Sequence, residues 1–174
     1  MQSALIVAVP EAEPAVRALR EAYDPSASWG VPAHVTVLYP FLPPPRIGAS
    51  VLAAVRAGVQ VVPAFDLTLA RTGWFGAEVL WLAPEPDGPF RALTAAVWQR
   101  FPQTPPYGGE FADVVPHLTV ADRQPPAVLR AAQDRVRPLL PISARVRSVR
   151  LIAGPPEPGG SWRTVAEFPL PAGR

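Results

Sequence analysis

Hydrophobic residues recur along the chain at two spacings, which separate the predicted strands from the predicted helices. Short runs rich in valine, isoleucine and leucine predict buried strands, and apolar residues at every third or fourth position predict helices that bury one face. The predicted strands cover residues 5–9, 34–39, 65–72, 79–83, 117–121, 145–153 and 162–168. The predicted helices cover residues 14–23, 47–59, 90–101 and 128–139, and the proline-rich residues 102–116 predict a long loop.

The order of these elements repeats itself. It is β-α-β-α-β over about residues 1–75, the same again over 79–153, and one last strand over 162–168. The central strand regions of the two repeats, residues 31–37 and 114–120, are near copies of each other. The sequence therefore predicts an α+β fold of two similar lobes, produced by internal duplication within a single domain that spans residues 1–174.

Composition narrows the chemistry. The chain has 174 residues, of which 49% are hydrophobic, and its 25 prolines and 12 glycines lie between apolar runs and so punctuate structure. It has no cysteine, which excludes disulfide bonds, a thiol nucleophile and thiolate-bound metals. It also has no lysine, so every basic side chain is an arginine, which suits forked contacts with phosphate.

The charge is small and unevenly distributed. The net charge is +2, with seven arginines against ten acidic residues in 1–121 and nine arginines against four acidic residues in 122–174. A basic C-terminal part favours a phosphate-bearing ligand, although a solvated arginine-rich surface explains it equally well. Binding along a long nucleic-acid strand needs many phosphate contacts, so the balance favours a small nucleotide or an RNA end as partner.

The first residues predict a location in the cytoplasm and no membrane partner. The apolar run after Met1 stops at Pro10 and has no positively charged residue before it, unlike a signal peptide. No stretch approaches the roughly 20 apolar residues of a membrane span. We further expect a monomer.

The strongest functional signal is a repeated motif. The chain contains only two histidines, and each begins the pattern His-x-Thr-Val, at His34 and at His117. Residues i and i+2 of a strand point to the same face, so His34 projects with Thr36 and His117 with Thr119. If the two lobes face each other across a pseudo-two-fold axis, both pairs meet in one cleft.

Such a centre suits reactions of a phosphodiester. One histidine can take a proton from the attacking oxygen while the other gives a proton to the leaving oxygen. The hydroxyls of Thr36 and Thr119 can donate hydrogen bonds to the phosphoryl oxygens as charge develops on them. The motif therefore predicts His34 and His117 as catalytic residues and the two threonines as phosphate-binding residues.

Two other interpretations compete with this one. A single histidine on a strand is more often structural, and threonine is common in strands, but two matching motifs that use every histidine favour a functional site. A two-histidine metal site is the sharper competitor. It lacks a third histidine, and neither strand carries an acidic residue at a spacing next to its histidine. We therefore expect no metal and no cofactor.

The two tetrapeptides, His34–Val37 and His117–Val120, lie about eighty residues apart in a duplicated chain and resemble those of the 2H phosphoesterase superfamily. The closest resemblance is to its 2′-5′ RNA ligase-like, or cyclic phosphodiesterase, branch. It implies a bilobal fold with two antiparallel-rich β-sheets facing a central cleft and helices packed outside. It also implies metal-independent hydrolysis of 2′,3′-cyclic phosphates, 2′-5′-linked RNA ends or small cyclic nucleotide phosphates. The residues leave open which histidine is the base, and the resemblance favours His117 as base and His34 as acid.

Two further functions fit the same residues. A duplicated RNA-end or nucleotide-binding module would keep the cleft without turnover, and a reversible 2′-5′ RNA ligase would use the same site in the opposite direction. A matched acid and base argue for turnover, because binding alone needs neither. The sequence does not separate hydrolysis from ligation.

Other side chains are weaker candidates for the site. Arg123 follows the second motif and is a candidate phosphate ligand, with an ion pair to its neighbour Asp122 as the alternative. Trp29 and Tyr107 are candidates for stacking on a base, and Tyr107 lies in the loop before the second motif, where a lid is another possibility. Loop packing is the alternative for both. Arg145 and Arg147 share one strand face and either contact phosphate or protect an edge.

Overall fold

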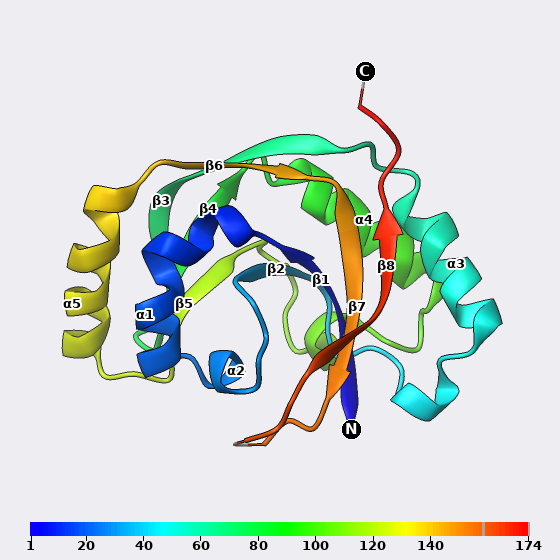
Figure 1. The fold of residues 1–174 in the computed structure, drawn as a ribbon, viewed down its shortest axis with the longest axis horizontal. Coiled ribbons are helices and arrows are strands. Elements are labelled where there is room, and N and C mark those ends of the chain that lie inside the picture. The colour runs from blue at the N-terminus through cyan, green and yellow to red at the C-terminus, as the bar shows by residue number, and fades with distance from the viewer. Residues whose placement is uncertain (158, 174) are drawn as a thin grey trace.

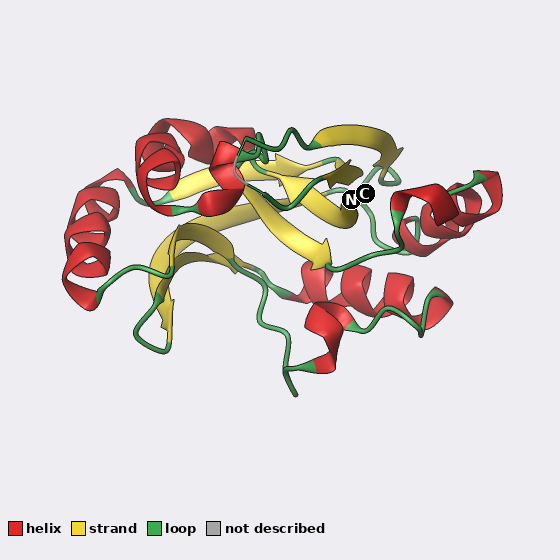
Figure 2. Ribbon diagram, turned by 90° about the horizontal axis from the view of Figure 1, so that it is seen from below, coloured by secondary structure: helices red, strands yellow, loops and turns green. Residues whose placement is uncertain are grey.

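The computed structural model describes residues 1–157 and 159–173, and within them the strands form one antiparallel sheet with helices on its outer side (Figures 1 and 2). The strands are β1 (Gln2–Ala8), β2 (His34–Leu38), β3 (Phe65–Phe75), β4 (Val79–Glu85), β5 (Leu118–Asp122), β6 (Ile142–Val146), β7 (Ser148–Gly154) and β8 (Arg163–Pro169). The helices are α1 (Glu13–Tyr23), α2 (Pro25–Ser28), α3 (Ala49–Val59), α4 (Gly88–Arg100) and α5 (Pro126–Val136). Short 3-10 turns lie at Pro10–Ala12, Pro44–Arg46, Pro106–Gly109 and Arg137–Leu139.

Most predicted elements match the structure, with one clear error. The strand predicted over 145–153 is two strands, β6 and β7, which separate at Arg147 and pair with different neighbours, β3 and β1. No glycine or proline marks this break in the sequence, so the local pattern reads as continuous. The sequence pattern also does not predict the short helix α2.

The sheet has two four-stranded halves. Its strand order is β6-β3-β4-β5-β2-β1-β7-β8, and β2 meets β5 at the centre through the residue pair Val35 and Leu118. Helices α1 and α5 pack against β5, and α4 and α3 pack against β2 and β8 respectively. This arrangement confirms the predicted fold class, with the two expected sheets present as the joined halves of one curled sheet (Figure 2).

The strand order is symmetric about the centre. Strand β1 lies beside β2 and β4 lies beside β5, while β3 pairs with β4 and β7 pairs with β1. Each half therefore contains strands from both predicted repeats. This order would arise if a duplicated chain exchanged strands between its repeats, with β3 joining the half that contains β4 and β5 and β7 joining the half that contains β1 and β2. The duplication over residues 1–75 and 79–153 stays a prediction.

Side chains alternate between the two faces of the sheet. In β1, Leu5 and Val7 join the large core beneath the helices, whereas Ala4 and Ile6 join a smaller cluster on the other face. In β2 and β5 the buried Val35 and Leu118 likewise point into the large core. The same alternation turns the polar residues of the two motifs to the opposite face. In the described part of the chain, no helix combines the length and apolar character that crossing a bilayer requires.

We predict that the central contact is a main source of stability. Leu118 is fully buried where it pairs with Val35 and Leu82, so Leu118→Ala should lower the free energy of unfolding by about 2–5 kcal/mol. Leu139→Ala is the control because Leu139 is exposed, and it should cost at most about 0.5 kcal/mol. Urea unfolding followed by circular dichroism measures both. Equal losses for the two variants would contradict the assignment.

Candidate active site

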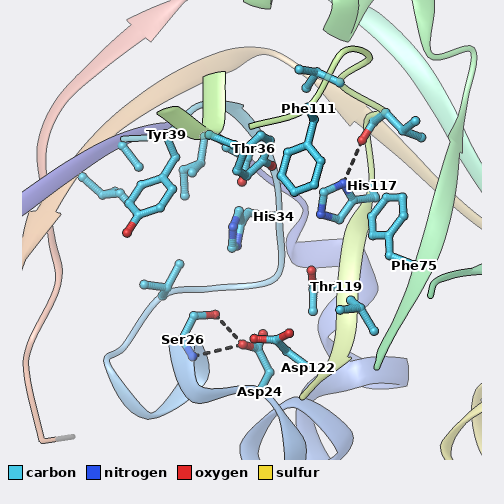
Figure 3. Close-up of a pocket in the computed structure, with 18 of the residues that line it drawn as sticks. Asp24, Ser26, His34, Thr36, Tyr39, Phe75, Phe111, His117, Thr119 and Asp122 are labelled. Carbon is cyan, nitrogen blue, oxygen red and sulfur yellow. Dashed lines mark hydrogen bonds between the residues drawn. The ribbon is translucent and has the colours of Figure 1, made fainter. Parts of the chain in front are cut away.

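The two motifs line one cleft between the halves of the sheet. The cleft has a volume of about 520 Å³, and the side chains of His34, Thr36, His117 and Thr119 all contribute to its wall. Figure 3 shows these four side chains turned toward a common space. The structure therefore brings together the four residues that the sequence predicts as catalytic and phosphate-binding.

Strand pairing explains how they meet. Val35 pairs with Leu118 in antiparallel register, and extending that register by one residue in each direction sets His34 opposite Thr119 and His117 opposite Thr36. Side chains directly opposite each other in such a pair lie on the same face of the sheet. Each histidine thus faces the threonine of the other motif.

Both imidazoles are oriented by the same backbone contact. The Nδ1 atom of His34 lies 2.8 Å from the carbonyl oxygen of Pro32, and Nδ1 of His117 lies 2.8 Å from that of Val115. A carbonyl oxygen only accepts hydrogen bonds, so each Nδ1 carries the proton and donates it. In the neutral ring Nε2 is then an acceptor, available to take a proton from a ligand.

Aromatic rings surround His117. The ring centroids of Phe75, Trp81 and Tyr107 lie 4.8, 6.1 and 6.5 Å from that of the imidazole. Burial among these groups lowers the pKa of His117 below 6.5, because the charged form loses hydration, and the hydrogen bond to Val115 partly opposes the shift.

His34 has a charged environment instead. Desolvation and the nearby guanidinium of Arg20 lower the pKa of His34 to about 4, although the bond to Pro32 and the charge of Asp24 act in the opposite direction. Arg20 is itself only 3% exposed and forms an ion pair with Asp24 at 3.0 Å. It also donates to the carbonyl oxygen of Val31, which links α1 to the segment that leads into β2.

The weaker candidates also line the cleft, with different degrees of exposure. The Arg123 side chain is 84% exposed and lies 3.9 Å from the Asp122 carboxylate. Trp29 stacks against Trp162, with centroids 6.2 Å apart and planes 15° from parallel. Tyr107 stacks on His117 at an angle of 26°.

The other two candidate arginines, Arg145 and Arg147, do not line the cleft. Arg145 forms an ion pair with Asp66 at 2.8 Å, and neither Arg145 nor Arg147 contributes to the cleft. Arg145 lies in β6 at the edge of the sheet, beside β3, whereas Arg147 lies between β6 and β7, so the prediction that the two arginines share one strand face is wrong.

The sequence pattern did not predict several of the residues that line the cleft. Asp24 and Ser26 come from the start of α2, Trp162 from the residue before β8, and Phe75 from the end of β3. Asp24 accepts hydrogen bonds from both the backbone and the hydroxyl of Ser26 (Figure 3). Asp122 faces the same end of the cleft, and burial raises its pKa. Asp24-Pro25-Ser26 has the pattern of a helix start, but nothing in the pattern points to a cleft.

Among the described residues, no group of three or more histidine, aspartate or glutamate side chains is placed to hold a metal ion.

The chain belongs to the 2′-5′ RNA ligase superfamily, whose family model matches residues 8–154. This match covers both motifs and confirms the resemblance drawn from them. The chain has no significant match among curated protein sequences.

Solved structures share the fold along nearly the whole chain. LigT from E. coli, in a crystal structure complexed with 3′-AMP, is 18% identical with a TM-score of 0.65, and the match covers 97% of both chains. TT0787 of Thermus thermophilus is 23% identical with a TM-score of 0.64, and the match covers 100% of both chains. At these identities the likeness establishes the fold alone.

We predict that both histidines are neutral in the free protein at pH 7. Because their pKa values are lowered, each ring gains its proton only in more acid solution, at about pH 4 for His34 and below pH 6.5 for His117. The imidazole ¹H–¹³C NMR signals, followed from pH 8 to pH 3.5 and assigned with His34→Gln, measure both midpoints. Midpoints at or above 6.5 would contradict the described environment.

The same shifts make folding sensitive to acid. The unfolded chain binds these protons at about pH 6.5, before the folded chain does, so the free energy of unfolding falls as the pH drops below 6.5. Each histidine contributes a slope of at most about 1.4 kcal/mol per pH unit. The His34→Gln variant should show a shallower fall.

Proposed function

We propose that the protein is a metal-independent phosphodiesterase that acts on 2′,3′-cyclic phosphates, 2′-5′-linked RNA ends or small cyclic nucleotide phosphates. The observation that carries this proposal is the placement of His34 and His117 in one cleft, each opposite the threonine of the other motif. Membership of the 2′-5′ RNA ligase superfamily supports the substrate class.

The reaction needs a base on one side of the phosphorus and an acid on the other. One neutral imidazole takes the proton of the attacking water through Nε2, and the new P–O bond forms as the ester bond on the opposite side breaks. The other imidazole, protonated at Nε2, gives its proton to the departing ribose oxygen. The two rings exchange protonation states, and solvent restores them after the product leaves.

The threonines stabilise the negative charge that develops. The hydroxyls of Thr36 and Thr119 lie on the same sheet face as the imidazoles and can donate hydrogen bonds to the two non-bridging phosphoryl oxygens. Such donors contribute most when water is excluded, and the aromatic groups around His117 favour this condition.

Substrate binding favours protonation of one histidine, which takes its proton from solvent. Both histidines are neutral in the free protein, whereas the reaction needs one of them charged. An anionic phosphate between the rings favours the imidazolium form and raises its pKa. The guanidinium of Arg20 resists a charge on His34, and Asp24 offsets part of that effect. His117 as base and His34 as acid remains the assignment that we propose from the family resemblance.

The remaining cleft residues fit a nucleotide. The stacked pair Trp29 and Trp162 presents an apolar aromatic wall suited to a base, and Arg123 lies at the exposed side for a further phosphate contact. The E. coli LigT structures hold 3′-AMP or NADP⁺, which supports a nucleotide ligand for this fold. We propose that the protein acts as a cytoplasmic monomer on an RNA 3′ end or a small cyclic nucleotide.

We predict that His34→Ala and His117→Ala each reduce hydrolysis of 2′,3′-cyclic nucleotides by at least about 10²-fold, because each proton transfer contributes about 10²–10⁴ to the rate. A phosphodiester with a p-nitrophenol leaving group separates the roles, since this group departs without an acid. On that substrate the variant of the acid, His34→Ala, should keep more activity than His117→Ala. Product release is followed by chromatography and absorbance.

Matched controls make this test decisive. Trp98→Ala removes an exposed aromatic side chain on α4 that does not line the cleft, and it should leave the rate unchanged. Activity should survive EDTA. A loss of activity that a divalent ion restores would move the site to the metal-dependent class.

Tight binding of a cyclic-phosphate RNA without product would favour the binding module, and joining of 2′,3′-cyclic and 5′-hydroxyl ends would favour the ligase. Full activity in either histidine variant would contradict the proposal.

A further inference from the structure

A loop residue contacts both motifs at once. Tyr107 lies in the 3-10 turn Pro106–Gly109, between α4 and β5, and its side chain is part of the cleft wall. Its phenol interacts with the Thr36 side chain of the first motif, and its ring stacks on His117 of the second motif with centroids 6.5 Å apart. Burial raises the pKa of Tyr107, so its hydroxyl keeps its proton near neutral pH.

The backbone around this residue is held in an unusual conformation. Tyr107 has φ +51° and ψ +35°, in the left-handed region that non-glycine residues rarely adopt, and Gly108 follows with φ +67°. The N–H of Tyr107 donates to the carbonyl oxygen of Tyr39, just beyond β2, at 2.6 Å. Such a conformation persists only where the surroundings fix it. Here the contacts with Tyr39, Thr36 and His117 do so.

The strand register explains why one side chain reaches both motifs. Thr36 lies opposite His117 in the β2–β5 pair, so a ring placed over His117 has its hydroxyl close to Thr36. Phe111 also contacts Tyr107. Its ring meets the Tyr107 ring edge-on, with centroids 5.8 Å apart, and the Phe111 residue is 58% exposed. His34 and Thr119, the other opposite pair in this register, have no aromatic neighbour of this kind among the described contacts.

We propose that Tyr107 is a positioning residue that couples the two motifs, a role that rests on the proposed function. A side-chain hydrogen bond joins the phenol to the Thr36 hydroxyl and fixes the direction of that hydroxyl beside the phosphoryl oxygens. The ring covers one face of the His117 imidazole, holds its plane and keeps water from its hydrogen bond to Val115. Tyr107 thereby orders one donor and one proton-transfer group from separate halves of the sheet.

Two substitutions separate the phenol from the ring. Tyr107→Phe keeps the ring and should lower kcat by roughly threefold to tenfold, the value of one neutral hydrogen bond, with KM nearly unchanged. Tyr107→Leu also removes the stacked ring and should lower kcat further. Tyr23→Phe is the matched control, because it removes a phenol outside the cleft, and its kcat should equal that of the unaltered protein.

A second readout does not depend on turnover. In Tyr107→Leu the NMR titration midpoint of His117 should move up toward 6.5, because the burial of its ring is relieved. In Tyr107→Phe the His117 midpoint should change little. The His34 midpoint should change little in both variants. Besides Tyr107, the charged and titratable groups that line the cleft with His117 are Asp24, His34, Tyr39, Asp113, Asp122 and Arg123. Arg20 acts on His34 from outside the cleft wall. Neither substitution removes any of these groups.

Each result decides a separate statement. If the unaltered protein hydrolyses no phosphodiester, the proposed function fails and the NMR titration alone tests the positioning role. An unchanged kcat in Tyr107→Phe in an active protein would overturn the role of the phenol. An unchanged His117 midpoint in Tyr107→Leu would overturn the role of the ring. If Tyr107→Leu does not fold, Tyr107→Phe still tests the proposal.

Discussion

The contact between β2 and β5 at the centre of the sheet is the constraint on which the rest of the structure depends. One antiparallel residue pair, Val35 with Leu118, joins the two halves and fixes the register of both motif strands. Because side chains alternate along a strand, that register buries the valine and leucine on one face and sets the histidines and threonines on the other. A shift by one residue would reverse every one of these positions. The hydrophobic core and the candidate site are therefore specified by the same pairing.

The two halves of the site are alike in backbone and different in surroundings. Each imidazole donates to a carbonyl oxygen two residues earlier, at the same 2.8 Å. Around that common frame, His117 has aromatic neighbours, whereas His34 lies near a buried arginine–aspartate pair. Both surroundings disfavour the charged ring by removing water, and at His34 the nearby positive charge of Arg20 adds to this effect. A duplicated frame with unequal surroundings can give two identical residue types different roles in one reaction.

The sequence was sufficient for the motifs and most elements because their signals are local. The signals depend on neighbouring residues only, both for the alternation in β2 and β5 and for the apolar spacing of α1, α3, α4 and α5. The two copies of the His-x-Thr-Val motif could be paired with each other because their sequences match. The break between β6 and β7 depends on which distant strands they pair with, which no local pattern records. Asp24, Phe75 and Trp162 reach the cleft from separate elements through the curl of the sheet, so their spacing in the chain carries no signal. The sequence predicts Tyr107 in a loop, as a candidate for stacking on a base. Its contacts with both motifs depend on tertiary structure and could not be predicted.

A crystal structure with a nucleoside 2′,3′-cyclic vanadate, which mimics a five-coordinate phosphorus, tests the central claim most directly. The account predicts vanadium between the two imidazoles, with Nε2 of His34 and of His117 each within about 2.6–3.2 Å of an apical oxygen on opposite sides. Vanadate bound away from the two rings, or both rings on the same side of the metal, would contradict it.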